Sequence, residues 1–267
     1  MSWPFETSEE FVKAEQLMAY HRQQRGLSPE QDTYPATLIA TFQGGAYQHL
    51  LKRAGVQELA PNESPAGSGS IGDRASGVVD GVPVRLARVS VGAPAAALVL
   101  EHAIARGVRN VLVVGSAGSL QRHLPIGSTV IVEGAEREDG TSHHYLPAGE
   151  VVSADPELAR RLEAALVARG AAPVRGRAWT IDAPYRETVG AVRRHREAGV
   201  AVVEMEAAAI FAVARVRGAR AALVVSVSDE LWETWNPGFG HPAYVEALLR
   251  AADAAMDVAA QLGSSSK

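Results

Sequence analysis

Val202-Val203-Glu204-Met205-Glu206-Ala207-Ala208-Ala209 is the most informative stretch of this chain: an apolar run ends in two acids, and a helix of small residues follows at once. A second apolar run, Val225-Ser226-Val227, ends in Ser228-Asp229. Burying an acid is costly unless it is paired or used. The carboxyl end of a parallel strand is also where open α/β folds bind ligands. We therefore expect both runs to be strands whose ends share one pocket.

Apolar runs alternate with helical patterns along most of the chain. We predict strands over 37–42, 84–91, 111–115, 129–135, 177–182, 200–205 and 221–228, and helices over 7–26, 46–53, 94–106, 156–169, 186–198, 206–217 and 242–262. An Asp-Gly turn within 78–84 indicates a hairpin, whereas 60–77 is rich in Pro, Ser, Gly and Asn and is typical of a flexible loop. This order predicts an α/β fold of three layers, α/β/α, around a mixed sheet. No repeat or interdomain linker interrupts it, so we expect one domain over 1–267, with 1–35 as an N-terminal helical extension.

Composition excludes several classes of protein. The 26 basic and 30 acidic residues give a net charge of −4, which argues against a nucleic-acid partner. There is no cysteine, so disulfides, thiolate metal sites and a cysteine nucleophile are excluded. No apolar stretch is long enough to span a membrane, and the first ten residues are too acidic for a signal peptide. We expect a cytoplasmic protein that has no membrane partner.

The acids Glu204 and Glu206 are the first candidates for substrate binding. Alternate side chains of a strand share a face, so both acids can point into one pocket. A carboxylate accepts two hydrogen bonds and therefore suits the two adjacent hydroxyls of a ribose. The alternative is that one acid caps the helix that follows, whose N-terminus favours negative charge. Both interpretations can hold, with one acid in each role.

Two glycine-containing turns are candidate ligand contacts. The first, Val111–Ser119, is a strand that enters a turn at Gly115-Ser116-Ala117-Gly118, where small residues let a ligand approach the backbone. The second contains Gly92, and Pro94 suits the first turn of the helix that follows it. A tight strand-to-helix connection explains either turn equally well.

Three further segments carry candidate side chains. Asp229 is a candidate general acid, or else a cap. Tyr185 and Arg186 can stack on and hydrogen-bond a heterocycle, or simply stand at a helix start. The loop 139–147 offers His144 as a wall or lid of a sugar pocket. The adjacent pair His143-His144 seldom chelates one ion, so we expect no metal.

Together these segments resemble the nucleoside phosphorylase superfamily, which comprises purine nucleoside phosphorylases, uridine phosphorylases and related nucleosidases. The resemblance runs from about Val84 to Leu231. Val203–Ala208 looks like the ribose-binding E-M-E-A motif, and Val111–Leu120 looks like the family's glycine turn. Ser228-Asp229 is similar to the purine-type pair, whereas Asp139–Ser142 and Thr180–Arg186 look more like the uridine-phosphorylase branch.

The resemblance implies a twisted mixed sheet, a homo-oligomer (dimer, trimer or hexamer) and cleavage of an N-glycosidic bond, with inorganic phosphate as co-substrate and no cofactor. It implies that Glu206 and Met205 bind the ribose with Glu204 close by, and that Asp229 assists the leaving base. By the same match, Ser116 and Gly92 lie near the phosphate and the anomeric carbon. Tyr185 and Arg186 lie on the base side, and Ala117 and Gly118 complete the turn.

One departure concerns phosphate. The phosphorylases carry an early G-D-P-x-R loop, but this chain has Thr41-Phe42-Gln43-Gly44-Gly45-Ala46-Tyr47, and Val113-Val114 stands where a second arginine is usual. We expect Gly44, Gly45, Ser116 and Arg74 to bind phosphate instead. The nucleosidases use an early glutamate, and none occurs in 37–49. Phosphorolysis is the first hypothesis; a hydrolytic nucleosidase and a non-catalytic nucleoside-binding protein are the alternatives.

Overall fold

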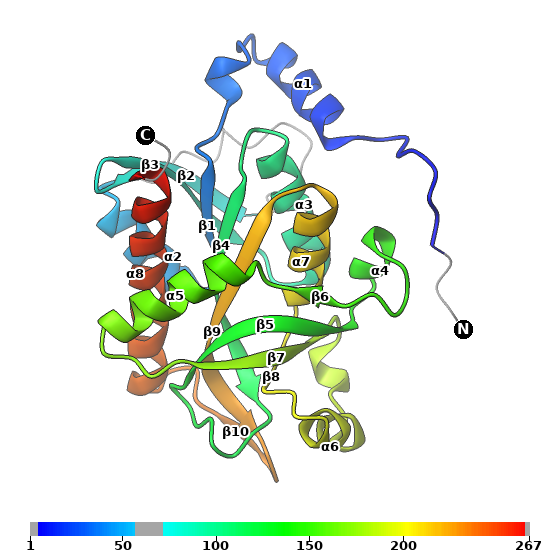
Figure 1. Cartoon of the computed structure of the whole chain (residues 1–267), viewed down its shortest axis with the longest axis vertical. Coiled ribbons are helices and arrows are strands. Elements are labelled where there is room, and N and C mark those ends of the chain that lie inside the picture. The colour runs from blue at the N-terminus through cyan, green and yellow to red at the C-terminus, as the bar shows by residue number, and fades with distance from the viewer. Residues whose placement is uncertain (1–4, 57–71, 265–267) are drawn as a thin grey trace.

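The computed structural model describes residues 5–56 and 72–264 (Figure 1). Its strands are β1 Thr37–Thr41, β2 Gly72–Val79, β3 Val82–Val89, β4 Asn110–Ser119, β5 Thr129–Glu138, β6 Val152–Ser153, β7 Val174–Ile181, β8 Val202–Glu204, β9 Arg220–Leu231 and β10 Trp235–Pro237. Its helices are α1 Ala14–Gln24, α2 Gly44–Arg53, α3 Ala93–Ile104, α4 Ser142–Tyr145, α5 Pro156–Ala168, α6 Val189–Glu197, α7 Ala207–Val216 and α8 Pro242–Ser264. Short 3-10 helices cover η1 Glu30–Asp32 and η3 Pro184–Arg186. The predicted alternation of strands and helices is confirmed.

The sheet is mixed, as predicted, and one end of it closes on itself. Strands β3, β1, β4 and β9 run parallel to one another, and β2 pairs antiparallel at the open edge. Beyond β9, the strands β5, β7 and β8 follow in order, and β8 pairs back onto β4. This closure brings the ends of β4, β8 and β9 together. The sequence pattern does not predict it, because pairing partners depend on tertiary contacts.

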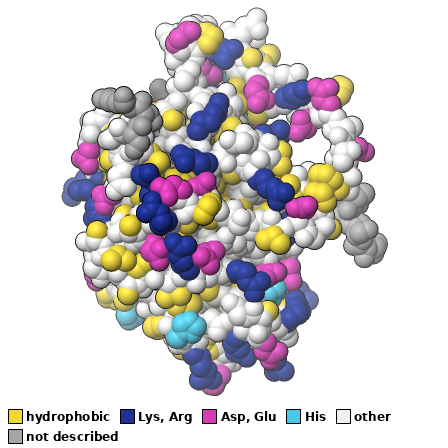
Figure 2. Space-filling model, viewed as in Figure 1, with side chains coloured by type: hydrophobic (Ala, Val, Ile, Leu, Met, Phe, Trp, Pro, Cys, Tyr) yellow, Lys and Arg dark blue, Asp and Glu magenta, His cyan; other side chains and the backbone are white. Residues whose placement is uncertain are grey.

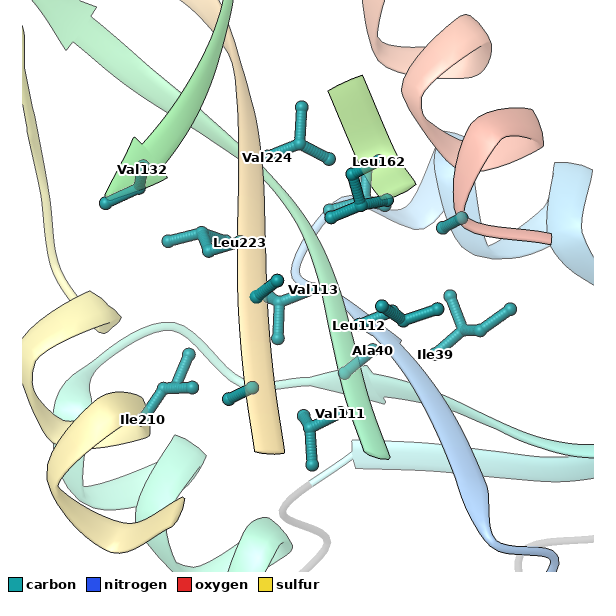
Figure 3. Close-up of a cluster of buried hydrophobic side chains, with 14 of the residues drawn as sticks. Ile39, Ala40, Val111, Leu112, Val113, Val132, Leu162, Ile210, Leu223 and Val224 are labelled. Carbon is teal, nitrogen blue, oxygen red and sulfur yellow. The ribbon is translucent and has the colours of Figure 1, made fainter. Parts of the chain in front are cut away.

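Helices cover both faces of the sheet. In Figure 1, α2, α5 and α8 lie on one side, and α3 and α7 on the other. Figure 3 shows the core between these layers: Leu162 of α5 and Ile210 of α7 approach from opposite sides of β4 and β9. Successive side chains such as Leu112 and Val113 point to opposite faces, so a strand buried on both faces is apolar throughout.

The β2–β3 hairpin is confirmed, but its first strand is longer than predicted. Asp80 and Gly81 have φ of 48° and 79°, the left-handed pair that suits a two-residue hairpin turn. Part of the predicted loop 60–77 lies outside the described residues, and Gly72–Gly77 belongs to β2. The loop prediction was wrong for 72–77, because pairing with β3 holds a polar, glycine-containing segment extended.

The N-terminal helix is shorter than predicted, since α1 begins at Ala14. Phe11 and Val12 are exposed, and no described element packs over them. Helices gain most of their stability from packing an apolar face, and the buried residues of α1 are Met18 and His21. None of the described helices is both long and apolar enough to cross a membrane.

Candidate active site

A cavity of about 540 Å³ opens at the carboxyl ends of β1, β4, β8 and β9, the lower end of the molecule in Figure 1. This volume lies within the range of small-molecule sites. Its lining includes most of the predicted residues: Ser116, Ala117, Gly118, Tyr185, Glu204, Met205, Glu206 and Asp229. The remaining lining residues are Phe42, Gln43, Val91, Pro184, Glu187, Val203, Ser228, Leu231, Trp235 and Phe239. The ends of β8 and β9, which the sequence predicts to share one pocket, therefore meet in one cavity.

Glu206 is a buried acid that lines this cavity. Its backbone is the N-cap of α7, and its Oε1 accepts a hydrogen bond of 2.6 Å from the Gly92 amide. Gly92 has φ of 112°, a conformation that side-chain-bearing residues avoid, so a glycine is required where the chain turns toward Glu206. Burial, together with the neighbouring Glu204 carboxylate, raises the pKa of Glu206.

Glu204 has a different role from Glu206. Its Oε2 accepts hydrogen bonds from the Glu206 and Ala207 amides at 2.8 and 2.7 Å, and its Oε1 accepts one from the Thr180 hydroxyl. Burial raises the pKa of Glu204, while these three donors act in the opposite direction. Glu204 thus caps α7 and fixes the backbone that carries Glu206. The structure thus assigns the expected capping role to Glu204. The ribose-binding role of Glu206 stays a prediction.

Two polar residues of the lining are joined by a hydrogen bond. Gln43 Nε2 donates to Ser116 Oγ at 2.8 Å, which joins the loop after β1 to the turn of β4. Tyr244 of α8 also hydrogen-bonds Ser116, and burial raises the pKa of this tyrosine. The Nη1 atom of Arg88, at the end of β3, would stand 3.5 Å from a Cβ placed on Gly44. A cationic group therefore lies beside the first residue of α2.

Another part of the lining is aromatic and acidic. Asp229 accepts hydrogen bonds from Ser228 Oγ at 2.7 Å and from Trp235 Nε1 at 2.9 Å. Gly118 lies directly beside it, because an added Cβ would collide with Leu231 and stand 3.2 Å from Asp229 Oδ2. Burial, followed by repulsion from Asp229, raises the pKa of Glu187 to about 7. A flat heterocycle fits between such apolar rings and hydrogen-bonding groups.

Several predicted residues do not line the cavity. His144 is exposed on α4 and lines a different hollow, beside the N-terminal arm. Arg74 lies in β2 near His102, away from the cavity. Arg186 is exposed at the end of η3, and Gly45 is exposed in α2. These predictions were wrong. Gly44 and Gly92 adjoin the cavity through Gln43 and Glu206 without lining it.

The loop 139–147 fails as a lid for a physical reason. Arg137 donates to the carbonyls of Ser142, Leu146 and Pro147, at 2.7–2.8 Å each, and thereby fastens the loop to the end of β5. Asp139 is buried and accepts from the Ser142 amide and hydroxyl. The polar residues that suggested a sugar contact are therefore used to fold the loop. Within 5–56 and 72–264, no cluster of His, Asp or Glu residues could hold a metal ion.

Sequence reasoning missed Gln43, Glu187, Trp235 and Phe239 among others. Glu187 directly follows the predicted Tyr185-Arg186 pair, but a helix-start pattern does not tell which side chain turns inward. Trp235 and Phe239 belong to a segment rich in aromatic residues, which was the available indication. β10 pairs with β9, and the Trp235 indole donates to Asp229; that pairing is visible only in the fold.

A family model described as "Phosphorylase superfamily" matches residues 38–263, so this chain belongs to that superfamily. It is 28% identical over 165 residues to a uridine phosphorylase of Haemophilus influenzae, which covers 57% of this chain and 66% of the relative. It is 31% identical over 152 residues to a guanosine phosphorylase of Halorubrum lacusprofundi, which covers 57% of this chain and 63% of the relative. The matched region thus spans slightly less than two thirds of the length of these relatives.

Solved structures share the fold across nearly the whole chain. The purine nucleoside phosphorylase of Toxoplasma gondii in complex with immucillin-H superposes with a TM-score of 0.78 at 17% identity, covering 98% of this chain and 100% of that one. A uridine phosphorylase of Vibrio fischeri gives 0.72 at 21% identity, covering 89% of this chain and 95% of that one. The three-layer α/β/α class and the superfamily membership are confirmed.

Proposed function

We propose that this chain is a nucleoside phosphorylase, which cleaves the N-glycosidic bond of a purine or pyrimidine nucleoside to free base and (deoxy)ribose 1-phosphate. The observation that carries the proposal is the position of Glu206. It is buried and lines one cavity together with the hydrogen-bonded pair Gln43 and Ser116 and the hydrogen-bonded pair Trp235 and Asp229. We assign phosphate to Gln43 and Ser116 (the anion end) and the base to Asp229 and Trp235 (the base end), with the ribose at Glu206 between them.

The reaction follows from this order of groups. A phosphate oxygen forms the new bond to the anomeric carbon, while the bond from that carbon to the base nitrogen breaks and its electron pair leaves with the base. The Glu206 carboxylate accepts hydrogen bonds from the ribose hydroxyls, which become more acidic as positive charge develops on the sugar. That interaction is stronger in the transition state than in the substrate, and so it accelerates the reaction. A carboxylic acid at Asp229 would give its proton to the departing base.

Phosphate binding has support of its own in this structure. The Gly44 amide begins α2, whose N-terminus carries partial positive charge. Arg88 stands beside that glycine and supplies a full positive charge. The Ser116 hydroxyl and Gln43 amide group can both hydrogen-bond an oxyanion. In this proposal these groups bind phosphate, in place of Gly45 and Arg74, which the sequence predicts as phosphate ligands.

Hydrolysis is the second candidate, and one observation favours it. None of the described residues that line the cavity is a lysine or arginine, and Phe42 occupies part of the anion end. A dianion such as phosphate needs positive charge or several amides, whereas water needs neither.

One experiment separates these functions. The enzyme is incubated with inosine, guanosine and uridine, with and without phosphate, and the products are separated. We expect ribose 1-phosphate and free base only when phosphate is present. Release of free ribose in both conditions would replace phosphorolysis by hydrolysis. Nucleoside binding without any product would instead support the non-catalytic alternative.

We also propose a homo-oligomer. Phe11 and Val12 in the N-terminal arm and Phe239 beside the cavity are large exposed apolar residues, which interfaces between subunits commonly cover. Sedimentation at micromolar concentration tests this, and a single monomeric species would contradict it. The cytoplasmic location and the absence of a cofactor stay predictions.

A further inference from the structure

A second group of buried charges surrounds Tyr34, at the amino end of β1 and thus at the opposite end of that strand from the cavity. The guanidinium carbons of Arg85 and Arg106 stand 4.2 and 5.0 Å from the centre of the Tyr34 ring. Arg74 of β2, His102 of α3 and Asp32 of η1 complete the group, which we call the Tyr34 cluster. In Figure 1 it lies where β1 begins below α1.

The Tyr34 cluster holds more positive than negative charge. Arg106 Nε donates to Asp32 Oδ1 at 2.9 Å, while Arg85 Nη1 donates to a neutral hydroxyl, Ser76 Oγ, at 2.7 Å. Burial, followed by repulsion from Arg74 and Arg106, lowers the pKa of His102 to about 4. The carbonyls at the end of α3 offset part of this field. Buried guanidinium groups are costly without a full counter-charge.

Polar atoms without partners gather in the same place. In the described part of the chain, the buried atoms Arg74 Nε, Arg85 Nε, Arg106 Nη1 and His102 Nδ1 have no hydrogen-bond partner, and neither does Asp32 Oδ2. The side chains of Arg85, Arg106, His102 and Asp32 are each more than nine-tenths buried. Each such atom costs free energy unless something satisfies it. Three arginine nitrogens require acceptors, and one carboxylate oxygen requires a donor.

We propose that the Tyr34 cluster is a second anion site, separate from the catalytic cavity, and that it binds inorganic phosphate in its hydrogen-bearing form. The phosphate oxygens accept from the arginine nitrogens, which favour phosphate geometry. The remaining P–OH donates to Asp32 Oδ2, which would repel an anion that carries no proton. Sulfate at neutral pH and chloride have no such proton, so the acid selects phosphate over both.

Two members of the cluster lie near the surface. Arg74 of β2 is only half-buried. His102 also lines a hollow of about 630 Å³ between the N-terminal arm and α3. Figure 2 shows the gap between this arm and the body of the molecule, at the right of the view.

Phosphate binding at fixed ionic strength tests the proposal, with equilibrium dialysis of radiolabelled phosphate as the measurement. In Arg74→Gln the affinity of one site should fall about tenfold or more, because a charged donor is lost. Arg160→Gln, an exposed arginine paired with Glu157 on α5, is the matched control and should change nothing. Arg88→Gln should weaken only the catalytic site. A site that responds to Arg74 but not to Arg88 therefore supports the proposal even if the enzyme proves to be a hydrolase, and binding unchanged in Arg74→Gln overturns it.

Selectivity provides the second test. Asp32→Asn should reduce the preference for phosphate over sulfate about tenfold, because the amide can donate to either anion. Thermal unfolding checks that both variants are folded. Crystals grown in phosphate should show a tetrahedral anion in contact with Asp32 and the arginines, and crystals grown in sulfate should not. Water in both crystals, or sulfate bound as well as phosphate, which would mean an adventitious ion only, overturns the proposal.

Discussion

The Glu206 carboxylate accepts a hydrogen bond of 2.6 Å from the amide of Gly92, a residue 114 positions earlier in the chain. This bond joins the N-cap residue of α7 to the N-cap residue of α3. It holds one oxygen of Glu206 and leaves the carboxylate at the cavity wall. The side chain that we assign to the ribose hydroxyls is therefore oriented before substrate arrives, which favours catalysis.

Glu206→Ala should lower kcat/KM by about 100-fold or more, because it removes the hydroxyl contact that strengthens in the transition state. Stability should fall by about 1 kcal/mol, because the buried Gly92 amide loses its acceptor while Glu204 still caps α7. Steady-state kinetics with inosine and uridine, beside thermal unfolding, measure both effects. Glu197→Ala, at the exposed end of α6, is the control. Unchanged turnover in Glu206→Ala would remove the proposed role.

The pH dependence of activity follows from the ionisation of Glu206. Burial and Glu204 raise the pKa of Glu206, and the proposed role requires its charged form. Activity should therefore fall with decreasing pH at a higher pH than an ordinary glutamate would cause. The acid limb of kcat/KM against pH measures this in the free enzyme. In Glu206→Gln that limb should disappear from the residual activity, and its persistence would assign it to another group.

Glu204→Ala should act on stability more than on chemistry. It leaves the Glu206 and Ala207 amides and the Thr180 hydroxyl without their acceptor, and losing a helix cap with buried donors costs about 2 kcal/mol. Urea unfolding gives the free energy directly. A variant as stable as the wild type would mean that these donors find other partners, and the cap assignment would fail.

Asp229→Asn tests the base end. If Asp229 protonates the leaving base, purine nucleosides should lose far more activity than pyrimidine nucleosides, by about tenfold or more in the ratio of kcat/KM values. The asparagine keeps the size of the side chain and can still contact Ser228 and Trp235. Equal losses for both substrate classes would indicate that Asp229 only positions Trp235.

The strand ends are predictable because their chemistry is local. An acid that follows an apolar strand must be capped, paired or used, and this reasoning leads to Glu204, Glu206 and Asp229 without any structure. Ser116 and Gly118 follow from the same logic, because a strand that ends in small residues admits a ligand. In each case the residue and its role lie within a few positions of one another.

The errors concern positions set by distant contacts. His144 lies in the polar loop that the sequence suggests for a sugar, but Arg137 folds that loop back onto β5. Arg74 is a cation in the part of the sequence where a phosphate ligand is expected. Its position in β2 places it in the Tyr34 cluster instead. No recognisable sequence motif surrounds Arg88, so sequence reasoning does not find it. Its place beside Gly44 depends on the pairing of β3 with β1, which aligns Arg88 with Thr41.

Arg88→Gln tests whether that pairing provides the phosphate cation. We expect KM for phosphate to rise about tenfold, the usual worth of one charge-assisted contact, and KM for the nucleoside at saturating phosphate to stay nearly constant. Arg53→Gln is the matched control, because Arg53 lies on the same helix as Gly44, at its other end, and pairs with Asp253. A rise in both Michaelis constants would indicate a distorted cavity. An unchanged phosphate KM would show that the amides, Gln43 and Ser116 bind phosphate without Arg88.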